Sequence, residues 1–339
     1  MNATMLLEKT KHHPVMLDQI LSIISPQHGG IFIDCTFGGG GYSEGILKYP
    51  RTKVFAIDRD ESTKNYARNL EKKFPERFNF SLSKFSNLKK VFSSKLKARG
   101  VIFDLGLSSY QLADEKRGFS FKSKNFLSME MGLNECTAFE VVNKLEKKNL
   151  INLIKILGEE KDAKSIVTAI VNYRKISEIK TSEELASIIN KAKKRGKNYK
   201  KNLSTKTFQA LRIFINQELT ELVQGLIAAT EVLEEDGILI IVSFHSLEDK
   251  IVKNFFNLYS NLKKNPSRYL FLKNNQSTLF KSALKKPLTP SRKEIIHNIR
   301  SRSAKLRYGM RNNNSFYPLE ELKKKFNKYF RLNAIKVWY

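Results

Sequence analysis

The stretch from Gly30 to Asp60, GIFIDCTFGGGGYSEGILKYPRTKVFAIDRD, decides the expected fold. It contains an apolar strand at residues 31–33, a glycine run at residues 38–41, a short helix, and a second apolar strand at residues 54–57 that ends in Asp58. This order is typical of half of a nucleotide-binding α/β unit, in which glycines let the backbone approach a ligand. An acid about 20 residues after such glycines can accept hydrogen bonds from ribose hydroxyls.

The residues of the glycine loop favour a nucleoside ligand without phosphates. A pyrophosphate loop is expected to have the pattern G-x-G-x-x-G at the start of a helix. Here the loop is TFGGGGYSEG, and Glu44 falls in the first helical turn, where it would repel a pyrophosphate. S-adenosylmethionine is the common ligand of this kind, and a tight turn without any ligand is the structural alternative.

Length and composition favour a globular protein of the cytoplasm. A chain of 339 residues predicts roughly two domains. No apolar stretch is long enough to span a membrane, and the N-terminus lacks the pattern of a secretory signal. Cys35 and Cys136 are too few for a disulfide framework or a zinc cluster, and a metal role for His12 and His13 would need further ligands. We therefore expect no membrane segment and no metal site.

The charge balance indicates a polyanionic partner. The 61 basic and 33 acidic residues give a net charge of +28, which favours nucleic acid. Residues 191–201 hold seven basic residues and no acid, and residues 281–311 hold ten basic residues against Glu294 alone. A solvated charged surface is the usual explanation for one such run, but two runs with Tyr199 and Tyr308 favour a surface that binds phosphates.

Two further strands place candidate site residues at the carboxyl end of the predicted sheet. The strand at residues 78–82 is followed by Phe85, for which core packing and stacking on an adenine are equal alternatives. The strand at residues 101–105 carries Asp104 within an otherwise apolar run. A buried acid is costly unless it is hydrogen-bonded or functional, so we expect Asp104 to belong to the site.

A helical insertion is expected to interrupt the sheet. From about residue 138 the apolar residues recur at spacings of three and four, and Thr181 with Glu184 forms a predicted capping box. The predicted domains are the first part of the sheet domain (1–112), the helical insertion (113–215), and the second part of the sheet domain with a basic C-terminal segment (216–339).

After the insertion the sheet is predicted to resume. Residues 208–226 indicate one long amphipathic helix that packs on the sheet, and GILIIVSF, residues 237–244, indicates a buried parallel strand. Ser246 is the expected cap of the next helix. His245 lies at the carboxyl end of the strand, where a structural role is favoured over a catalytic one. The basic segment is expected to complete the sheet as a hairpin.

A series of motifs spans nearly the whole chain in a recognisable order. They are HHPVMLDQIL, FIDCTFGGGGYSEGIL, AIDRD, FDLGLSSYQLADEKRGFSF, GEEKDAKSIVTAIV, STKTFQALRIFIN, SFHSLEDKIVK and RSRSAKLR. Together they resemble the bacterial ribosomal RNA small subunit methyltransferase H family. The resemblance implies a Rossmann-like class I S-adenosylmethionine-dependent methyltransferase sheet with an inserted all-helical domain. It also implies methylation of the exocyclic N4 of one cytosine in the decoding region (P site) of 16S rRNA, within the small ribosomal subunit or its late assembly intermediate.

The resemblance also implies a set of cofactor contacts. Carried over by position, these are Gly40, Gly41, Tyr42, Asp58, Phe85, Asp104 and Gln111. The chain departs from the family pattern at Tyr42, where His is usual, and at Ser128, Glu130 and Gly132, where Asp, Arg and Asp are usual. The last three departures concern RNA engagement more than cofactor binding.

The catalytic hypothesis places polar groups around the reacting amine. Many amino-group methyltransferases use an (Asp/Asn/Ser)-Pro-Pro-aromatic loop, but this chain has DLGLSSYQ there. We therefore expect Asp104, Ser108 and Ser109 to line the place where N4 meets the methyl group, with His245 or Ser243 as a second polar wall.

Two other functions, and the oligomeric state, remain open from the sequence. One alternative is a nucleotide-dependent oxidoreductase, which Glu44 disfavours. The other is a non-enzymatic RNA-binding or ribosome-assembly factor with a degenerate nucleotide pocket. A homodimer is one of the oligomeric states that the sequence allows.

Overall fold

The computed structural model describes residues 14–92, 96–193, 202–260 and 278–337. By their internal contacts the residues form two compact units. The first contains Met1–Gly106 and Glu221–Lys325, and the second contains Leu107–Thr220 and Phe326–Tyr339. The second unit thus includes the C-terminal residues, which the sequence pattern grouped with the sheet. The division of functions among the predicted domains stays a prediction.

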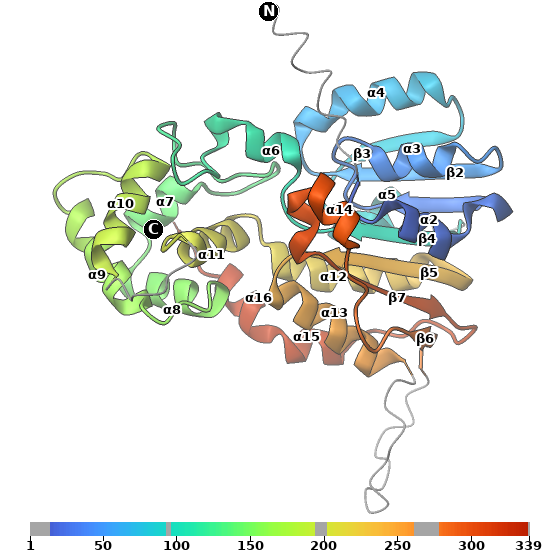
Figure 1. The fold of residues 1–339 in the computed structure, drawn as a ribbon. Helices are drawn as coiled ribbons and strands as arrows, with labels where there is room; N and C mark the ends of the chain where they lie inside the picture. The colour runs from blue at the N-terminus through green and yellow to red at the C-terminus, as the bar shows by residue number, and fades with distance from the viewer. Residues whose placement is uncertain (1–13, 93–95, 194–201, 261–277, 338–339) are drawn as a thin grey trace, which may run out of the picture. The chain divides into compact units, whose positions relative to one another are not determined.

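The described part of the first unit contains one seven-stranded sheet with the order β3-β2-β1-β4-β5-β7-β6 (Figure 1). The five neighbouring strands β3, β2, β1, β4 and β5 pair in parallel. Strand β7 pairs antiparallel with both β5 and β6. The predicted α/β fold is confirmed, and so is the C-terminal hairpin. The strands are β1 (Gly30–Asp34), β2 (Thr52–Asp58), β3 (Phe78–Leu82), β4 (Ala98–Asp104), β5 (Leu233–Ser243), β6 (Phe280–Ala283) and β7 (Lys305–Arg311).

Helices cover both faces of this sheet. Ile240 and Val242 of β5 share a core with the buried apolar residues of α2, α3 and α4. Side chains alternate along a strand, so Leu239 and Ile241 face the opposite side. On that side α13 contacts β5, β6 and β7. The helices of this unit are α2 (Leu17–Ile24), α3 (Gly41–Leu47), α4 (Lys64–Lys73), α5 (Leu88–Val91), α13 (Ser246–Tyr259), α14 (Arg292–His297) and α15 (Glu320–Lys325), with short 3-10 turns η1 (Pro26–His28), η2 (Glu61–Thr63), η3 (Phe85–Asn87) and η5 (Ile299–Ser303).

The described part of the second unit is built from helices around its own core. Helix α8 packs on α9 and α11, and α9 packs on α10. The predicted capping box is confirmed, because Thr181 accepts a hydrogen bond from the Glu184 amide and Glu184 accepts one from the Thr181 amide. The elements are α6 (Ser109–Ala113), η4 (Glu115–Arg117), α7 (Ala138–Lys144), α8 (Lys147–Leu157), α9 (Ala163–Arg174), α10 (Ser182–Ala192), α11 (Thr205–Ile215) and α16 (Asn327–Asn333). Helix α12 (Glu218–Val232) begins in this unit and continues into the first.

The prediction of one long helix over residues 208–226 is wrong. Helix α11 ends at Ile215 and α12 starts at Glu218, and Gln217 between them has a left-handed backbone with φ of 54°. The apolar periodicity continues through this break because both helices bury one side, so the pattern does not reveal it. Helix α11 packs on α8 of its own unit.

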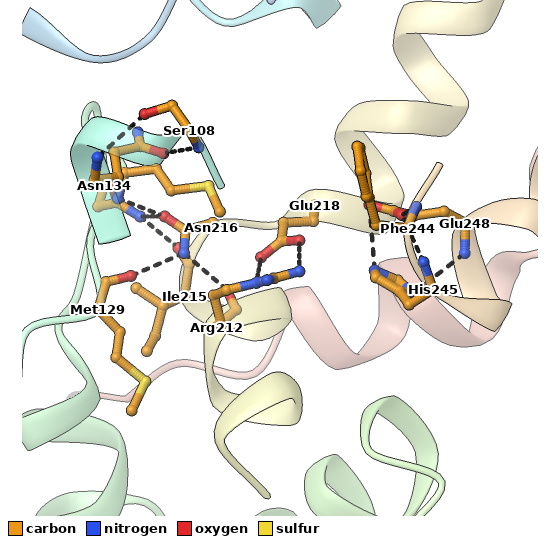
Figure 2. Close-up of polar contacts among 12 residues, drawn as sticks. Ser108, Met129, Asn134, Arg212, Ile215, Asn216, Glu218, Phe244, His245 and Glu248 are labelled. Atoms are coloured by element: carbon orange, nitrogen blue, oxygen red, sulfur yellow. Dashed lines mark hydrogen bonds and ion pairs between the residues drawn. The ribbon is translucent and has the colours of Figure 1, made fainter. Parts of the chain in front are cut away.

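The Asn216 side chain joins this break to the segment that precedes α7 (Figure 2). Its Oδ1 accepts hydrogen bonds from Met131 N at 2.8 Å and Asn134 Nδ2 at 2.9 Å. Its Nδ2 donates to Met129 O and to Arg212 O, both at 2.9 Å. The Asn216 side chain therefore fixes a segment in which Met129 has a positive φ of 59°.

Two sequence features lie outside the described residues. Residues 194–201, which make up most of the first basic run, are not described, and neither are His12 and His13. Of the helices that the structure does describe, none combines the length and the apolar character needed to cross a bilayer.

Replacing Asn216 by Ala should destabilise the second unit. The substitution leaves the amide of Met131 and the carbonyl of Met129 buried without these partners, which costs about 2–4 kcal/mol of unfolding free energy. Urea denaturation followed by circular dichroism measures the change. Asn172→Ala on the exposed side of α9 is the matched control, and it should shift the unfolding free energy by less than about 0.5 kcal/mol. Equal stability of the two variants would contradict the role of Asn216.

Candidate functional site

Three acids end three adjacent parallel strands. Asp34 is the last residue of β1, Asp58 of β2 and Asp104 of β4. Asp34 pairs in register with Ala56 and Ile102, which lie two residues before the other two acids. The carboxyl ends therefore meet where the strand order reverses between β1 and β4, which is where open α/β sheets bind ligands.

Asp58 shapes the glycine loop and remains partly accessible. Its Oδ2 accepts a hydrogen bond from Gly38 N at 2.7 Å, and its Oδ1 accepts one from Asp60 N at 2.9 Å. Burial raises the pKa of Asp58 to about 6, against the two backbone hydrogen bonds, which lower it. A carboxylate oxygen has more than one lone pair, so both oxygens can still accept hydrogen bonds from ribose hydroxyls.

Asp34 lies at the same edge of the sheet as Asp58 and Asp104, and the sequence reasoning missed it. It is fully buried, its Oδ2 accepts a hydrogen bond from Ser43 Oγ at 2.7 Å, and its Oδ1 accepts one from Thr36 N at 3.2 Å. Burial raises the pKa of Asp34 to about 6. The signal that could have found it is the one used for Asp104, an acid at the end of an apolar strand.

Asp104 has an acceptor atom available for a ligand. Its Oδ1 is buried and has no hydrogen-bond partner among the described residues. Burial raises the pKa of Asp104 to about 8, while a hydrogen bond with Tyr42 opposes the rise. The Tyr42 hydroxyl also donates to Val15 O at 2.6 Å, so its single proton is shared between two acceptors. With a pKa of about 8, the acid is expected to be mainly neutral near pH 7 when no cation is bound.

The residues of the glycine loop are also explained by packing. A Cβ on Gly40 would lie 2.6 Å from Leu70 Cδ1, and one on Gly41 would lie 2.2 Å from Pro14 Cγ. Tyr42 follows in the first turn of α3 and is buried. Glu44 is half-buried, and its Oε1 lies 2.6 Å from Lys73 Nζ, which weakens the expected repulsion of phosphates. Cofactor roles for Gly40, Gly41 and Tyr42 stay predictions.

Phe85 packs inside the first unit and is partly exposed. Its ring meets Phe103 edge-on, with 5.3 Å between the ring centres. A Cβ on Gly225 of α12 would lie 2.6 Å from Phe85 Cδ2, so this glycine makes room for the ring. Phe85 is only half-buried, so these contacts do not exclude stacking on an adenine, which stays a prediction.

His245, and not Ser246, caps helix α13, which corrects the expected cap (Figure 2). Its Nδ1 accepts from Glu248 N at 3.4 Å, and Glu248 Oε2 accepts from Phe244 N at 2.9 Å. His245 Nε2 lies 3.2 Å from Glu248 Oε1 but lacks hydrogen-bond geometry to any described group. The sequence pattern favoured Ser246 because serine is a common N-cap residue, whereas histidine is not. These contacts give His245 a structural role, and a catalytic role stays a prediction.

Ser108, Ser109 and Gln111 belong to the second unit, at helix α6. Ser108 Oγ accepts from Gln111 N at 3.2 Å, and Gln111 Oε1 accepts from Ser108 N at 3.0 Å. This reciprocal capping box starts the helix. Asp104 and His245, in contrast, belong to the first unit. The catalytic roles of Ser108 and Ser109, and the cofactor role of Gln111, stay predictions.

Comparison with known proteins decides the family. The sequence profile of the MraW methylase family matches residues 9–311. The chain belongs to the MraW methylase family. A ribosomal RNA small subunit methyltransferase H of Ehrlichia canis is 44% identical over 299 residues, covering 87% of this chain and 98% of that protein. Its counterpart in a Wolbachia from Drosophila simulans is 44% identical over 299 residues, covering 87% of this chain and 97% of that protein. A solved rRNA methylase from Streptococcus thermophilus covers 86% of this chain and 95% of its own, with 11% identity and a TM-score of 0.38.

Membership in the MraW methylase family confirms the predicted enzyme class and methyl donor. The protein is a methyltransferase that uses S-adenosylmethionine, and the oxidoreductase alternative is removed. The geometry fits this donor, because its sulfonium and ammonium groups are cations. In the described residues no Lys or Arg pairs with Asp34, Asp58 or Asp104. A cationic ligand would therefore relieve the cost of burying these three acids.

The raised pKa of Asp104 should make the stability of the ligand-free MraW protein fall with pH. An acid whose folded pKa lies above its unfolded value stabilises the fold below the unfolded pKa, and this contribution is lost as pH rises through the folded pKa. For Asp104 that window runs from about 4 to about 8, while the windows of Asp34 and Asp58 end near 6.

Between pH 6 and pH 8, Asp104 therefore contributes more than Asp34 or Asp58 to the fall of the unfolding free energy with pH. Asp104→Asn should reduce that slope, which is at most about 1.4 kcal/mol per pH unit for one group. Urea unfolding at pH 6, 7 and 8 measures it, with Asp114→Asn on the exposed surface as the control. Parallel curves for wild type and Asp104→Asn would contradict a raised pKa at this position.

Proposed function

We propose that this methyltransferase modifies ribosomal RNA of the small subunit, at the exocyclic N4 of one cytosine in the decoding region (P site) of 16S rRNA. The proposal places the enzyme in the cytoplasm, acting on the small subunit or its late assembly intermediate. The observation that carries it is the 44% identity to methyltransferase H proteins over nearly their whole length. The motifs DLGLSSYQL, RGFSF and SFHSLED, and the net charge of +28, support the same substrate.

The cofactor would be held by the first unit at the carboxyl ends of β1, β2 and β4. Asp58 accepts hydrogen bonds from the ribose hydroxyls while it keeps its bonds to Gly38 and Asp60. Phe85, which is partly exposed, contacts the adenine. When bound, the donor supplies an electrophilic methyl group. The protein has mainly to hold the cytosine amine in line with that group and to exclude water.

Asp104 is positioned to accept a proton or a hydrogen bond from a reactant. The cytosine N4 lone pair is delocalised into the ring, so the amine gains nucleophilic character as its proton is accepted. The Asp104 Oδ1 atom is a buried acceptor without a partner among the described residues. A positive charge nearby favours the ionised carboxylate, so binding of the cationic donor converts Asp104 into an acceptor.

The other polar candidates of the first unit, Ser243 and His245, already take part in structural hydrogen bonds. Ser243 Oγ donates to Lys305 O at 3.3 Å, which ties it to the pairing of β5 with β7. His245 Nδ1 is used at the start of α13. We therefore assign Asp104 the main role within the first unit, and Ser108 and Ser109 remain candidates from the second unit.

Binding of S-adenosylmethionine should release protons near pH 7. Asp104 has a pKa of about 8 in the ligand-free protein, and a cation lowers it. Titration calorimetry in buffers of different ionisation enthalpy should give a release of up to about one proton for each cofactor bound. Asp104→Asn should abolish most of this release. A release that is unchanged in Asp104→Asn would assign the proton to another group.

The RNA target is tested by mass spectrometry of 16S rRNA from cells that lack this gene. The N4 methyl group on the decoding-region cytosine should be absent and should return when the wild-type gene is supplied. Asp58→Ala should not restore it, because the ribose contacts are lost. Methylation that persists in the deletion strain would refute the proposed target. Full rescue of the deletion phenotype by a methylation-defective Asp58→Ala protein would favour the non-enzymatic assembly factor.

A further inference from the structure

The basic residues around β6 and β7 fall into two classes. The first class is structural. Arg307 is only 4% exposed, and its Nε donates to Asp249 Oδ1 at 2.7 Å, while Lys305 Nζ lies 3.2 Å from Asp249 Oδ2. Arg311 is 5% exposed and donates to backbone carbonyls, including Leu279 O at 3.1 Å. Lys281 pairs with Asp236. These four cations hold the hairpin in place.

The second class lies on the connection between the two strands, which carries α14 and η5. These side chains are exposed, and in the described part of the chain none of them pairs with a carboxylate. They are Lys285, Lys286, Arg292, Lys293, Arg300 and Arg302. The acid in this segment, Glu294, is already used, because its Oε1 accepts from Met16 N at 2.7 Å. The segment therefore carries a positive charge that the fold does not neutralise.

Two large apolar side chains project from the same segment. Ile296 is 74% exposed and Ile299 is 67% exposed. Neighbouring apolar groups left in water commonly mark a binding surface. We call the six unpaired cations and these two isoleucines the α14–η5 surface. A polyanion with apolar faces matches it better than an acidic protein does, because a nucleic acid strand offers phosphates, sugars and base faces together.

Hydrogen bonds attach this surface to the candidate site within the first unit. Glu294 binds the amide of Met16, and the carbonyl of the preceding Val15 accepts from the Tyr42 hydroxyl. Tyr42 in turn contacts Asp104. Figure 1 shows α14 near the start of α2, in agreement with the bond to Met16. The residues before α2 therefore join α14, through Glu294, to Tyr42 at the start of α3.

We propose that the α14–η5 surface binds the ribosomal RNA strand that presents the target base, with its cations on phosphates and its two isoleucines against sugars or unstacked bases. The proposal rests on the proposed function and goes beyond it, because it separates the binding cations from the structural ones. It assigns no contact to Arg307 or Arg311.

The test compares two variants that change the net charge equally. The surface variant replaces Arg292, Lys293, Arg300 and Arg302 by Gln. The control variant replaces four exposed cations of the same unit by Gln, namely Lys48, Lys53, Arg68 and Lys72. Both are measured for binding to small subunits purified from cells lacking the gene, across a series of KCl concentrations.

The surface variant should lose affinity and salt dependence together. Each phosphate contact contributes about 0.7 to the slope of log K against log salt for single strands, so four lost contacts lower the slope by about 3. Affinity near physiological salt should fall roughly 100-fold, while the control variant changes it by less than about threefold. Ile296→Ser with Ile299→Ser should weaken binding about tenfold at an unchanged slope, since no phosphate contact is lost.

The outcomes separate this proposal from the proposed function. Unchanged S-adenosylmethionine affinity in every variant shows that the fold is intact. If the surface variant binds and methylates as the wild type does, or if the control variant loses as much affinity, the α14–η5 proposal is overturned and the proposed function stands. If the wild type does not methylate the subunit although the surface variant loses binding, the proposed function fails instead. A change of sedimentation mass in the isoleucine variant, with RNA affinity unchanged, would assign the surface to a protein partner and overturn the proposal.

Discussion

Three carboxyl groups lie at the ends of adjacent strands, largely removed from water, and among the described residues no Lys or Arg pairs with them. Their burial is the constraint on which this structure depends. Burial raises the pKa of each of them. The surrounding contacts respond to that cost. Asp58 is compensated by the amides of Gly38 and Asp60, Asp34 by Ser43 and the Thr36 amide, and Asp104 by Tyr42. Hydrogen bonds to these acids therefore help to hold the glycine loop, α3 and the segment before α2 in place. A cationic ligand would offset the remaining cost of burying the three carboxyl groups.

The same network links elements that are far apart in the sequence. The Thr36 hydroxyl accepts from Asp104 N at 2.7 Å and so joins the ends of β1 and β4. The residues before α2 bridge Tyr42 and Glu294, which are about 250 positions apart in the chain. Since interior groups pack closely, a change at one end of this series of contacts is expected to be felt at the other. These contacts therefore give a physical link between a binding surface on α14 and η5 and the residues that follow the glycine loop.

Net charge alone overstates the surface that is available to RNA. Of the ten basic residues at positions 281–311, Arg307 and Arg311 are buried, and Lys281 and Lys305 are paired with acids. A guanidinium can satisfy several backbone carbonyls at once, as Arg311 does, so arginine in a basic run can be structural. Only the contacts distinguish such residues from those that can bind phosphate.

Some of these features could be predicted from local patterns and some could not. Apolar runs, the glycine turn and acids at strand ends were enough to predict a parallel α/β sheet, the positions of Asp58 and Asp104, and a separate helical region, because each depends on residues close in sequence. The break at Asn216 and Gln217 escaped prediction because the apolar period continues through it. His245 was not recognised as a cap because imidazole rarely takes that position.

Three-dimensional packing was needed for everything that depends on which segments become neighbours. It brought Asp34 to the same edge as the two predicted acids, left Asp104 Oδ1 without a partner among the described residues, and divided the basic residues into buried and exposed sets. Burial and pairing are properties of the folded chain, and a sequence pattern records the residue types but not their partners.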